Sequence, residues 1–203
     1  MNRFIQSLAV ATVFPVVLML LPGEASAQSM RFDCGTEEIA EEGACVLGLF
    51  DIEVVVSSSG LSSINTLSIR MGDADVSATD EVDGIVYRAE IADLNADGRP
   101  EVFAYVSSAG SGSYGSIVGY VVGENLELSP IALPDLGDSE EASTGYMGHD
   151  EFTVVESSLL RRFPLYHSGD VNAAPTGGSR SIAYKLGKAS DAWVLSIASI
   201  DDY

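Results

Sequence analysis

The sequence predicts an all-β fold, an antiparallel β-sandwich of about eight strands in a single domain. From Cys45 onward, short runs of β-branched or alternating apolar residues follow one another, with turn-forming residues between them. Helical periodicity is missing between these runs, which favours a sandwich or a barrel. The chain of 203 residues is long enough for one domain with a sizeable core.

Eight strands can be placed along the chain. They cover residues 45–56, 64–71, 84–94, 101–108, 116–123, 151–158, 181–187 and 192–200. Only residues 36–44 have a brief helical pattern.

The last two strands show the clearest alternation. Trp193, Leu195 and Ile197 share one face, and smaller residues occupy the other face. The connector of residues 188–190 is short, so the last two runs predict a terminal hairpin.

Two longer segments, 133–151 and 166–179, interrupt the strand pattern and are predicted to be surface loops. Long loops in a compact β domain are often functional, with disorder as the competing explanation.

The first 27 residues have the features of a secretory signal peptide. Arg3 precedes an apolar run, and Ala25-Ser26-Ala27 forms a small-residue cleavage site. An uncleaved membrane anchor is less consistent with this segment, because Pro22 and Gly23 end the apolar run. The sequence therefore predicts an exported domain of residues 28–203.

Both cysteines, Cys34 and Cys45, lie in the predicted mature chain. An exported protein meets an oxidising compartment, so this pair is expected to form a disulfide. Two cysteines and two distant histidines have no recognisable spacing for a metal site.

The formal net charge of −20 restricts the possible partners. Such a surface repels nucleic acid and anionic lipid, so neither is an expected partner, and it attracts cationic proteins. The alternative is that the acidity only confers solubility.

The segment from Asp93 to Glu101 places oxygen-bearing side chains at Asp93, Asn95, Asp97 and Glu101, with Gly98 at a sharp turn. This spacing resembles the calcium loops of integrin-type β-propeller repeats. The alternative is a tight turn in which Asp93 and Asn95 bind their own backbone. Calcium is therefore a possible ligand, and no cofactor is required.

Evidence for an enzyme is thin. Ser113 lies near a nucleophile-elbow pattern, but Ser111 replaces its first glycine. His149 and His167 are candidate bases, with Asp150 or Asp170 adjacent to them. We expect no catalytic residues and no enzymatic activity, and a secreted serine hydrolase is the less favoured alternative.

Residues 107–116, SSAGSGSYGS, separate two apolar strands. Tyr114 offers a large rigid contact, while Ser and Gly supply adaptable hydrogen bonds, the composition that antibody paratopes favour. The two interpretations are a binding loop that presents Tyr114 and a plain hairpin turn.

Residues 144–150 contain a possible second contact, formed by Tyr146, Met147 and His149. Aromatic residues and Met are enriched at interface cores. The alternative is that Tyr146 folds back onto the sandwich.

The order of motifs resembles the periplasmic inhibitors of invertebrate-type lysozyme of Gram-negative bacteria. The resemblance spans most of the predicted mature chain, in residues 87–122, 145–156, 175–186 and 193–203. Its most specific part is the D-x-N-x-D-G-x-P-E run followed by S-G-S-Y at 111–114. Inhibitors of other lysozyme classes have a related loop that is one residue longer.

This resemblance implies a homodimeric β-sandwich in the periplasm. It also implies that the loop of Ser111, Gly112, Ser113 and Tyr114 enters the active-site cleft of the lysozyme and so protects peptidoglycan. The main alternative from another class is a calcium-binding adhesion module that uses the Asp93–Glu101 loop.

Overall fold

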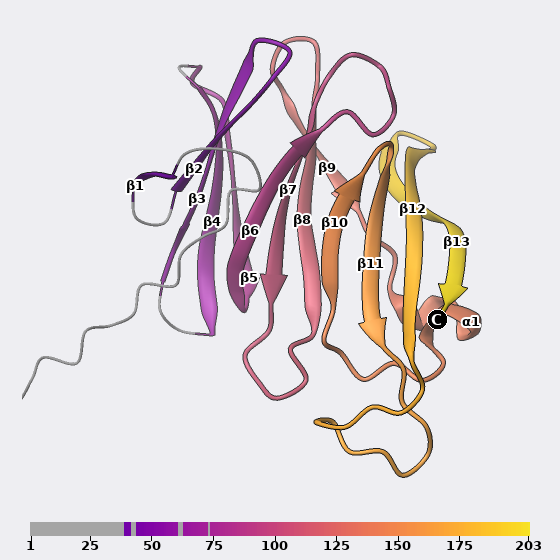
Figure 1. Ribbon diagram of the computed structural model, residues 1–203. Coiled ribbons are helices and arrows are strands. Elements are labelled where there is room, and N and C mark those ends of the chain that lie inside the picture. Colours follow the sequence, from indigo (N-terminus) through magenta and orange to yellow (C-terminus); the bar gives the residue numbers. More distant parts are fainter. Residues whose placement is uncertain (1–38, 42–43, 61–62, 73) are drawn as a thin grey trace, which may run out of the picture.

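The chain forms two β-sheets (Figure 1). The computed structural model describes residues 39–41, 44–60, 63–72 and 74–203, and the predicted signal peptide lies outside them. Within the described ranges there are thirteen strands, one short α-helix and one 3-10 helix.

The strands are β1 (Ile39–Glu41), β2 (Ala44–Leu49), β3 (Ile52–Ser59), β4 (Ile64–Met71), β5 (Ser77–Asp83), β6 (Ile85–Ala92), β7 (Glu101–Ser107), β8 (Gly115–Val122), β9 (Leu128–Ala132), β10 (Glu151–Val155), β11 (Ser158–Pro164), β12 (Ser179–Ala189) and β13 (Ala192–Asp202). The helices are η1 (Leu136–Asp138) and α1 (Glu140–Ser143).

The smaller sheet has the order β1-β2-β3-β4-β5, so each strand pairs with its neighbours in the sequence. Phe50 and Asp51 form the turn between β2 and β3, with φ of 52° and 61°. Two successive residues with positive φ suit the twist of a tight hairpin. The run predicted as one strand over 45–56 is therefore two strands, because Phe50 carries no turn preference that would mark the break.

The larger sheet has the order β10-β11-β12-β13-β9-β8-β7-β6. Its pairs are antiparallel except that β9 and β13 run parallel, which differs from the purely antiparallel prediction. The sheet curls until its edge strands β6 and β10 approach, and the Val154 amide donates to the Glu90 carboxylate at 2.9 Å. No backbone ladder joins β6 to β10 in the described ranges, so the curled sheet stays open there.

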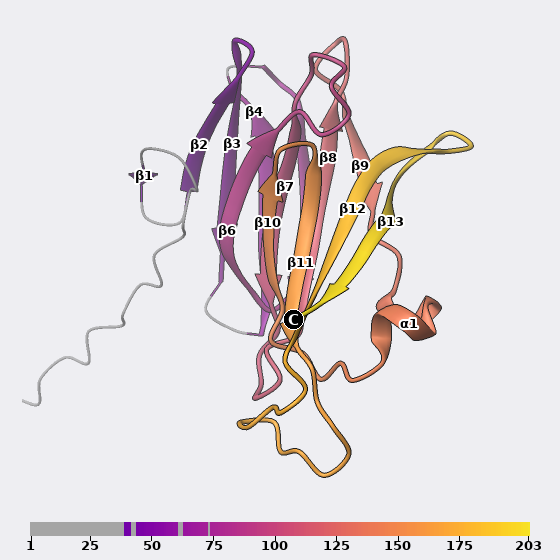
Figure 2. The same cartoon turned by 45° about the vertical axis from the view of Figure 1, so that its right-hand side comes forward.

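Strand β7 is buried on both faces because each face covers a different core. Val102, Ala104 and Val106 pack with residues of the five-stranded sheet. Phe103 and Tyr105 pack with apolar residues of β10 to β13, inside the curled sheet. Figure 2 shows β7 and β8 between these two layers. This double burial explains why residues 101–106 are almost continuously apolar.

The predicted all-β sandwich is confirmed, but there are more strands than the eight expected. The sequence pattern does not predict β5, β9 or β11. β5 has exposed acidic residues, and β9 contains Pro130. β11 begins directly after a turn and contains two arginines. The helical turn predicted over 36–44 is wrong in its described part, because Ile39–Glu41 forms β1 and pairs with β2.

The predicted terminal hairpin is confirmed by β12 and β13, which pair antiparallel through Ser190 at the turn. Leu195 is buried and Trp193 is half-buried, as their shared face requires. Ile197 differs from them, because its side chain is 41% exposed. After Ile197 the register shifts between Ala183 and Tyr184, where β13 has an extra residue.

The loops lie at the two ends of the larger sheet. The loop of residues 108–114 and the loop of 165–178 extend from one end of the larger sheet, and the loop of 93–100 lies at the other end (Figure 1). Among the described residues, no helix is long and apolar enough to cross a membrane.

Candidate binding site

The loop between β7 and β8 has a defined shape held by its own hydrogen bonds. The Ser108 amide donates to the Tyr114 carbonyl at 2.9 Å, and the Tyr114 amide donates to the Ser108 hydroxyl at 3.0 Å. The Ser113 amide donates to the Gly110 carbonyl at 3.2 Å, and both residues have positive φ. The φ of Gly110 favours glycine and the Ser108 hydroxyl accepts one of these bonds, which explains part of the composition of residues 107–116.

Tyr114 is 50% exposed at this loop. Its ring meets the Tyr146 ring edge-on, with centroids 5.7 Å apart. A Cβ at Gly112 would collide with the Tyr114 ring, so this ring position needs glycine there. Among the described residues, the hydrogen bonds of Tyr114 are made by its backbone and not by its hydroxyl, which leaves the hydroxyl available to a ligand.

Two other segments hold the backbone of this loop in place through hydrogen bonds. The His149 amide donates to the Gly112 carbonyl at 2.7 Å, and the Asn172 side-chain amide donates to the Ser111 carbonyl at 2.6 Å. A Cβ at Gly148 would collide with the Gly112 carbonyl oxygen. Three segments far apart in the sequence therefore meet at one place, and the backbone of the 111–114 loop is fixed by its neighbours.

The same contacts define the His149 tautomer. Because Asn172 donates from its Nδ2 to Ser111, its Oδ1 must be the acceptor that lies 2.9 Å from His149 Nε2. His149 Nε2 therefore carries a proton. Tyr166 holds Asn172 in turn, because its hydroxyl donates to the Asn172 carbonyl at 2.8 Å.

A buried ion pair between Asp150 and Arg161 lies next to the loop. The Asp150 side chain is fully buried and accepts hydrogen bonds from the Gly115 amide at 2.7 Å, the Tyr146 hydroxyl at 2.5 Å and Arg161 Nε at 2.7 Å. Arg161 also donates to the Tyr146 hydroxyl at 2.9 Å and lies over the rings of Tyr146 and Phe152. The first residue of β8 is thus connected to β11 through one carboxylate.

The electrostatics of this cluster follow from its burial. Burial raises the pKa of Tyr146, and the Asp150 carboxylate raises it further. Burial acts to lower the pKa of Arg161, but the charge and hydrogen bond of Asp150, together with the nearby tyrosines, outweigh this effect and the net shift is upward. Arg161 therefore stays charged and Tyr146 stays a hydrogen-bond donor.

The residues predicted as a second contact lie beside the first loop. Met147 is 37% exposed, His149 is half-buried, and the Tyr146 hydroxyl points into the buried cluster. Val171, on the loop of residues 165–178, is 64% exposed. The sequence pattern does not identify Val171 or Asn172 as site residues, because only the tertiary fold brings their loop to this end.

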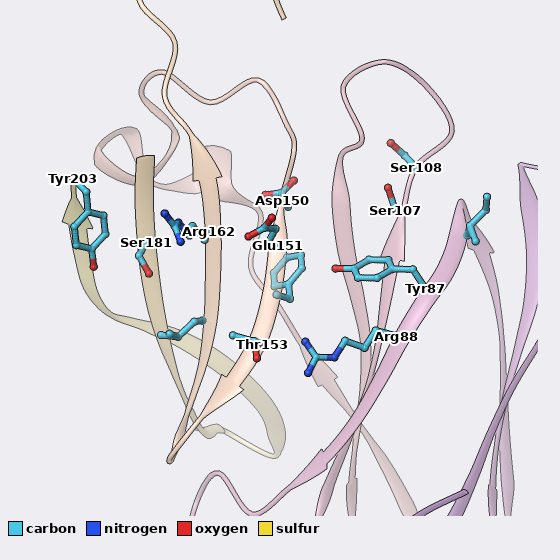
Figure 3. Close-up of a pocket in the computed structure, with 13 residues that line it drawn as sticks. Tyr87, Arg88, Ser107, Ser108, Asp150, Glu151, Thr153, Arg162, Ser181 and Tyr203 are labelled. Atoms are coloured by element: carbon cyan, nitrogen blue, oxygen red, sulfur yellow. The ribbon is translucent and has the colours of Figure 1, made fainter. Parts of the chain in front are cut away.

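A groove of about 1040 Å³ adjoins the base of the loop (Figure 3). It extends from β6 across β10 to residues of β11 and β12, and Tyr87 points from β6 toward β10. Burial raises the pKa of Tyr87, and a backbone hydrogen bond from Phe152 acts in the opposite direction. Ser107, Ser108 and Asp150 line the end of the groove nearest the loop, so the groove and the loop share one surface.

The Asp93–Glu101 segment forms the connection between β6 and β7. Asp93 accepts from the amides of Asp97 and Gly98 at 3.1 and 3.0 Å, and Asn95 Oδ1 accepts from the Asp97 amide at 2.9 Å. These are the bonds of the tight turn that was the alternative to calcium. In the described ranges, no three acidic, histidine or cysteine side chains already converge as a metal site.

Glu101 differs from the other carboxylates of this segment because it is completely buried. Burial raises the pKa of Glu101 to about 7, the Leu94 amide acts to lower it, and the charges of Asp97 and Asp93 raise it further.

The residues considered for a hydrolase have other partners. His149 Nε2 is engaged by Asn172, and His167 Nδ1 lies 3.0 Å from the Thr176 hydroxyl. Ser113 has no hydrogen bond to either histidine in the part of the chain that the structure describes. The absence of enzymatic activity therefore stays a prediction.

Cys45 is fully buried in the core between the two sheets. Its predicted disulfide partner, Cys34, lies outside the described residues, so the disulfide also stays a prediction.

A search against protein-family models and against curated proteins found no match to this chain.

Proposed function

We propose that this protein inhibits an invertebrate-type lysozyme by inserting the Ser111–Tyr114 loop into the active-site cleft of the enzyme. The observation that carries the proposal is the half-exposed Tyr114, held on a Gly/Ser loop whose backbone is fixed by His149 and Asn172. A preformed loop loses little conformational freedom on binding, which favours affinity. The resemblance of the sequence to such inhibitors points to the same loop.

The chemistry of a glycosidase cleft suits hydroxyl groups. Such a cleft contains two carboxyl groups several ångströms apart. The exposed Ser111 and the free Tyr114 hydroxyl can both donate to carboxylate oxygens or accept from a protonated carboxyl. Neither residue carries a charge that would need desolvation. Inhibition then needs only occlusion of the cleft.

The net charge of −20 supports a basic partner, because opposite charges increase the rate of encounter. The resemblance further implies that the protein is a homodimer and that it is located in the periplasm, and both statements remain proposals. Sedimentation of the mature protein tests the homodimer, since a monomer at micromolar concentration would contradict a stable dimer.

The direct test is an inhibition assay with the purified mature chain. Cell-wall lysis by an invertebrate-type lysozyme is expected to fall as the protein is added at near-stoichiometric ratios. A hen-type lysozyme serves as the control for specificity and is expected to keep its activity. Undiminished lysis by invertebrate-type enzymes at a large excess of the protein would contradict the proposed function.

The predicted second contact is tested at Met147. Replacing Met147 with alanine is expected to weaken lysozyme binding by about 1 kcal/mol, because a partly exposed side chain loses its burial against the partner. The measurement is the dissociation rate by surface plasmon resonance. Val155→Ala is the matched control, since Val155 is 46% exposed at the far end of β10. Equal dissociation rates for both variants would remove Met147 from the contact.

A further inference from the structure

The buried carboxylate of Glu101 has one oxygen without a partner. Glu101 is the first residue of β7 and its side chain is 0% exposed. Its Oε2 accepts from the Leu94 amide at 2.6 Å, and its Oε1 has no hydrogen-bond partner in the described structure. A buried polar atom without a partner is costly, so native proteins usually supply a water, a proton or an ion for it.

Other acidic side chains of the same segment act on Glu101. Besides burial, the negative charges of Asp97 and Asp93 both raise the pKa of its carboxyl group. The Leu94 amide holds the Glu101 carboxylate next to Asp93, at the beginning of the loop. The charges of Asp97 and Asp93 disfavour a negative charge on Glu101, whose own carboxylate is buried away from water.

The backbone of the loop curves around the side chains of Asp93 and Asn95. Oxygen-bearing side chains occur at alternate residues, at Asp93, Asn95 and Asp97, and again at Glu101, four residues further on. Ala96 and Gly98, between them, have φ of 57° and 81°, which makes the chain curve around the side chains of Asp93 and Asn95.

We propose that Asp93, Asn95, Asp97 and Glu101 bind a calcium ion, with Glu101 Oε1 as the ligand on the protein side. Calcium prefers carboxylate and amide oxygens and tolerates irregular coordination, whereas magnesium needs a near-ideal octahedron. Binding requires the amide of Asn95 to release Asp97 Oδ2, which it contacts at 2.9 Å. The oxygens of Asp93 keep their amide donors, because each has a second lone pair.

The position of this site predicts its role. The ligands lie on the connection between β6 and β7, whereas the Tyr114 loop lies at the other end of β7. The ion would therefore stabilise the β6–β7 hairpin without contacting a lysozyme bound at the Tyr114 loop. This inference is independent of the proposed function.

The test is calorimetric titration of calcium into the chelator-treated mature protein, together with thermal melting. We expect a saturable heat and a higher melting temperature with calcium, and a weaker effect with magnesium. Glu101→Gln should reduce the calcium affinity at least tenfold, while its side-chain oxygen still accepts from Leu94. Its melting temperature without calcium should not fall, because the variant removes a buried charge.

Glu124→Gln is the matched control. Glu124 is 82% exposed and lies 3.3 Å from Arg99 of the same loop, so it changes the local charge without removing a proposed ligand. This variant should keep the calcium affinity of the wild type. Three outcomes would overturn the proposal: no heat or melting shift up to about 10 mM calcium, wild-type affinity in Glu101→Gln, or equal losses in both variants.

Discussion

Replacing Arg161 with methionine is expected to lower the free energy of unfolding by about 3–5 kcal/mol, the range for breaking a buried ion pair at one partner. The Arg161 and Asp150 side chains are 6% and 0% exposed, so the remaining carboxylate would be buried without its counter-charge. Methionine keeps much of the side-chain volume, which limits the contribution of a cavity. Urea unfolding near pH 7 measures the change.

The neighbouring Arg162 provides the control. It is exposed on the opposite face of β11 and faces the groove, so Arg162→Met is expected to change stability by less than about 0.5 kcal/mol. Equal losses in the two variants would contradict a specific effect of leaving Asp150 buried without Arg161. A loss confined to Arg161→Met would confirm that effect.

The same carboxylate links stability to the candidate site. Asp150 accepts from the Gly115 amide, directly after Tyr114, and from Tyr146, whose ring supports Tyr114. Loss of Arg161 should therefore loosen the loop as well as the fold. A binding defect in Arg161→Met is thus no evidence that Arg161 contacts the partner, whereas a defect in an exposed loop residue is.

The sequence identifies those parts of the fold whose signal is local. The terminal hairpin follows from alternation in β12 and β13, and the exposed Tyr114 follows from the Gly and Ser around it. The strand β5 is missed because three of its seven residues are acidic and only Val82 is buried. A strand that depends on pairing rather than on burial has no pattern in its own residues.

The rest of the candidate site depends on contacts between distant residues. Asn172 reaches Ser111 across 61 positions, and Asp150 reaches Gly115 across 35. From the sequence alone, the Arg161 side chain would be expected on the surface, but β11 places it in the core. Such contacts come from the curling of the eight-stranded sheet, which no local pattern encodes.

Truncation of Tyr114 to alanine is expected to cost about 2–4 kcal/mol of lysozyme binding, as for a central aromatic anchor. Stability should change little, because the ring is 50% exposed and its edge-on contact with Tyr146 contributes at most about 1.5 kcal/mol. Tyr114→Phe separates the ring from the hydroxyl, since only the hydrogen bond is lost. Phe50→Ala is the control for an exposed aromatic, because Phe50 is 53% exposed on the β2–β3 turn.

Ser111→Ala should cost less, about 1–2 kcal/mol, because it removes one hydrogen bond and leaves a buried partner atom without a donor. The backbone carbonyl of Ser111 still accepts from Asn172, so the loop keeps its shape in this variant. Ser116→Ala, which removes an exposed hydroxyl from β8, is the matched control.

The double variant, which combines Ser111→Ala with Tyr114→Ala, tests whether both hydroxyls bind at one compact site in the enzyme. If they do, the combined loss should differ from the sum of the single losses by at least about 0.5 kcal/mol, because each contact depends on the other. Inhibition of an invertebrate-type lysozyme and melting temperature are measured on the same samples. A double variant that inhibits as well as the wild type would show that residues 107–116 only form a turn between β7 and β8, and the proposed mechanism would be wrong.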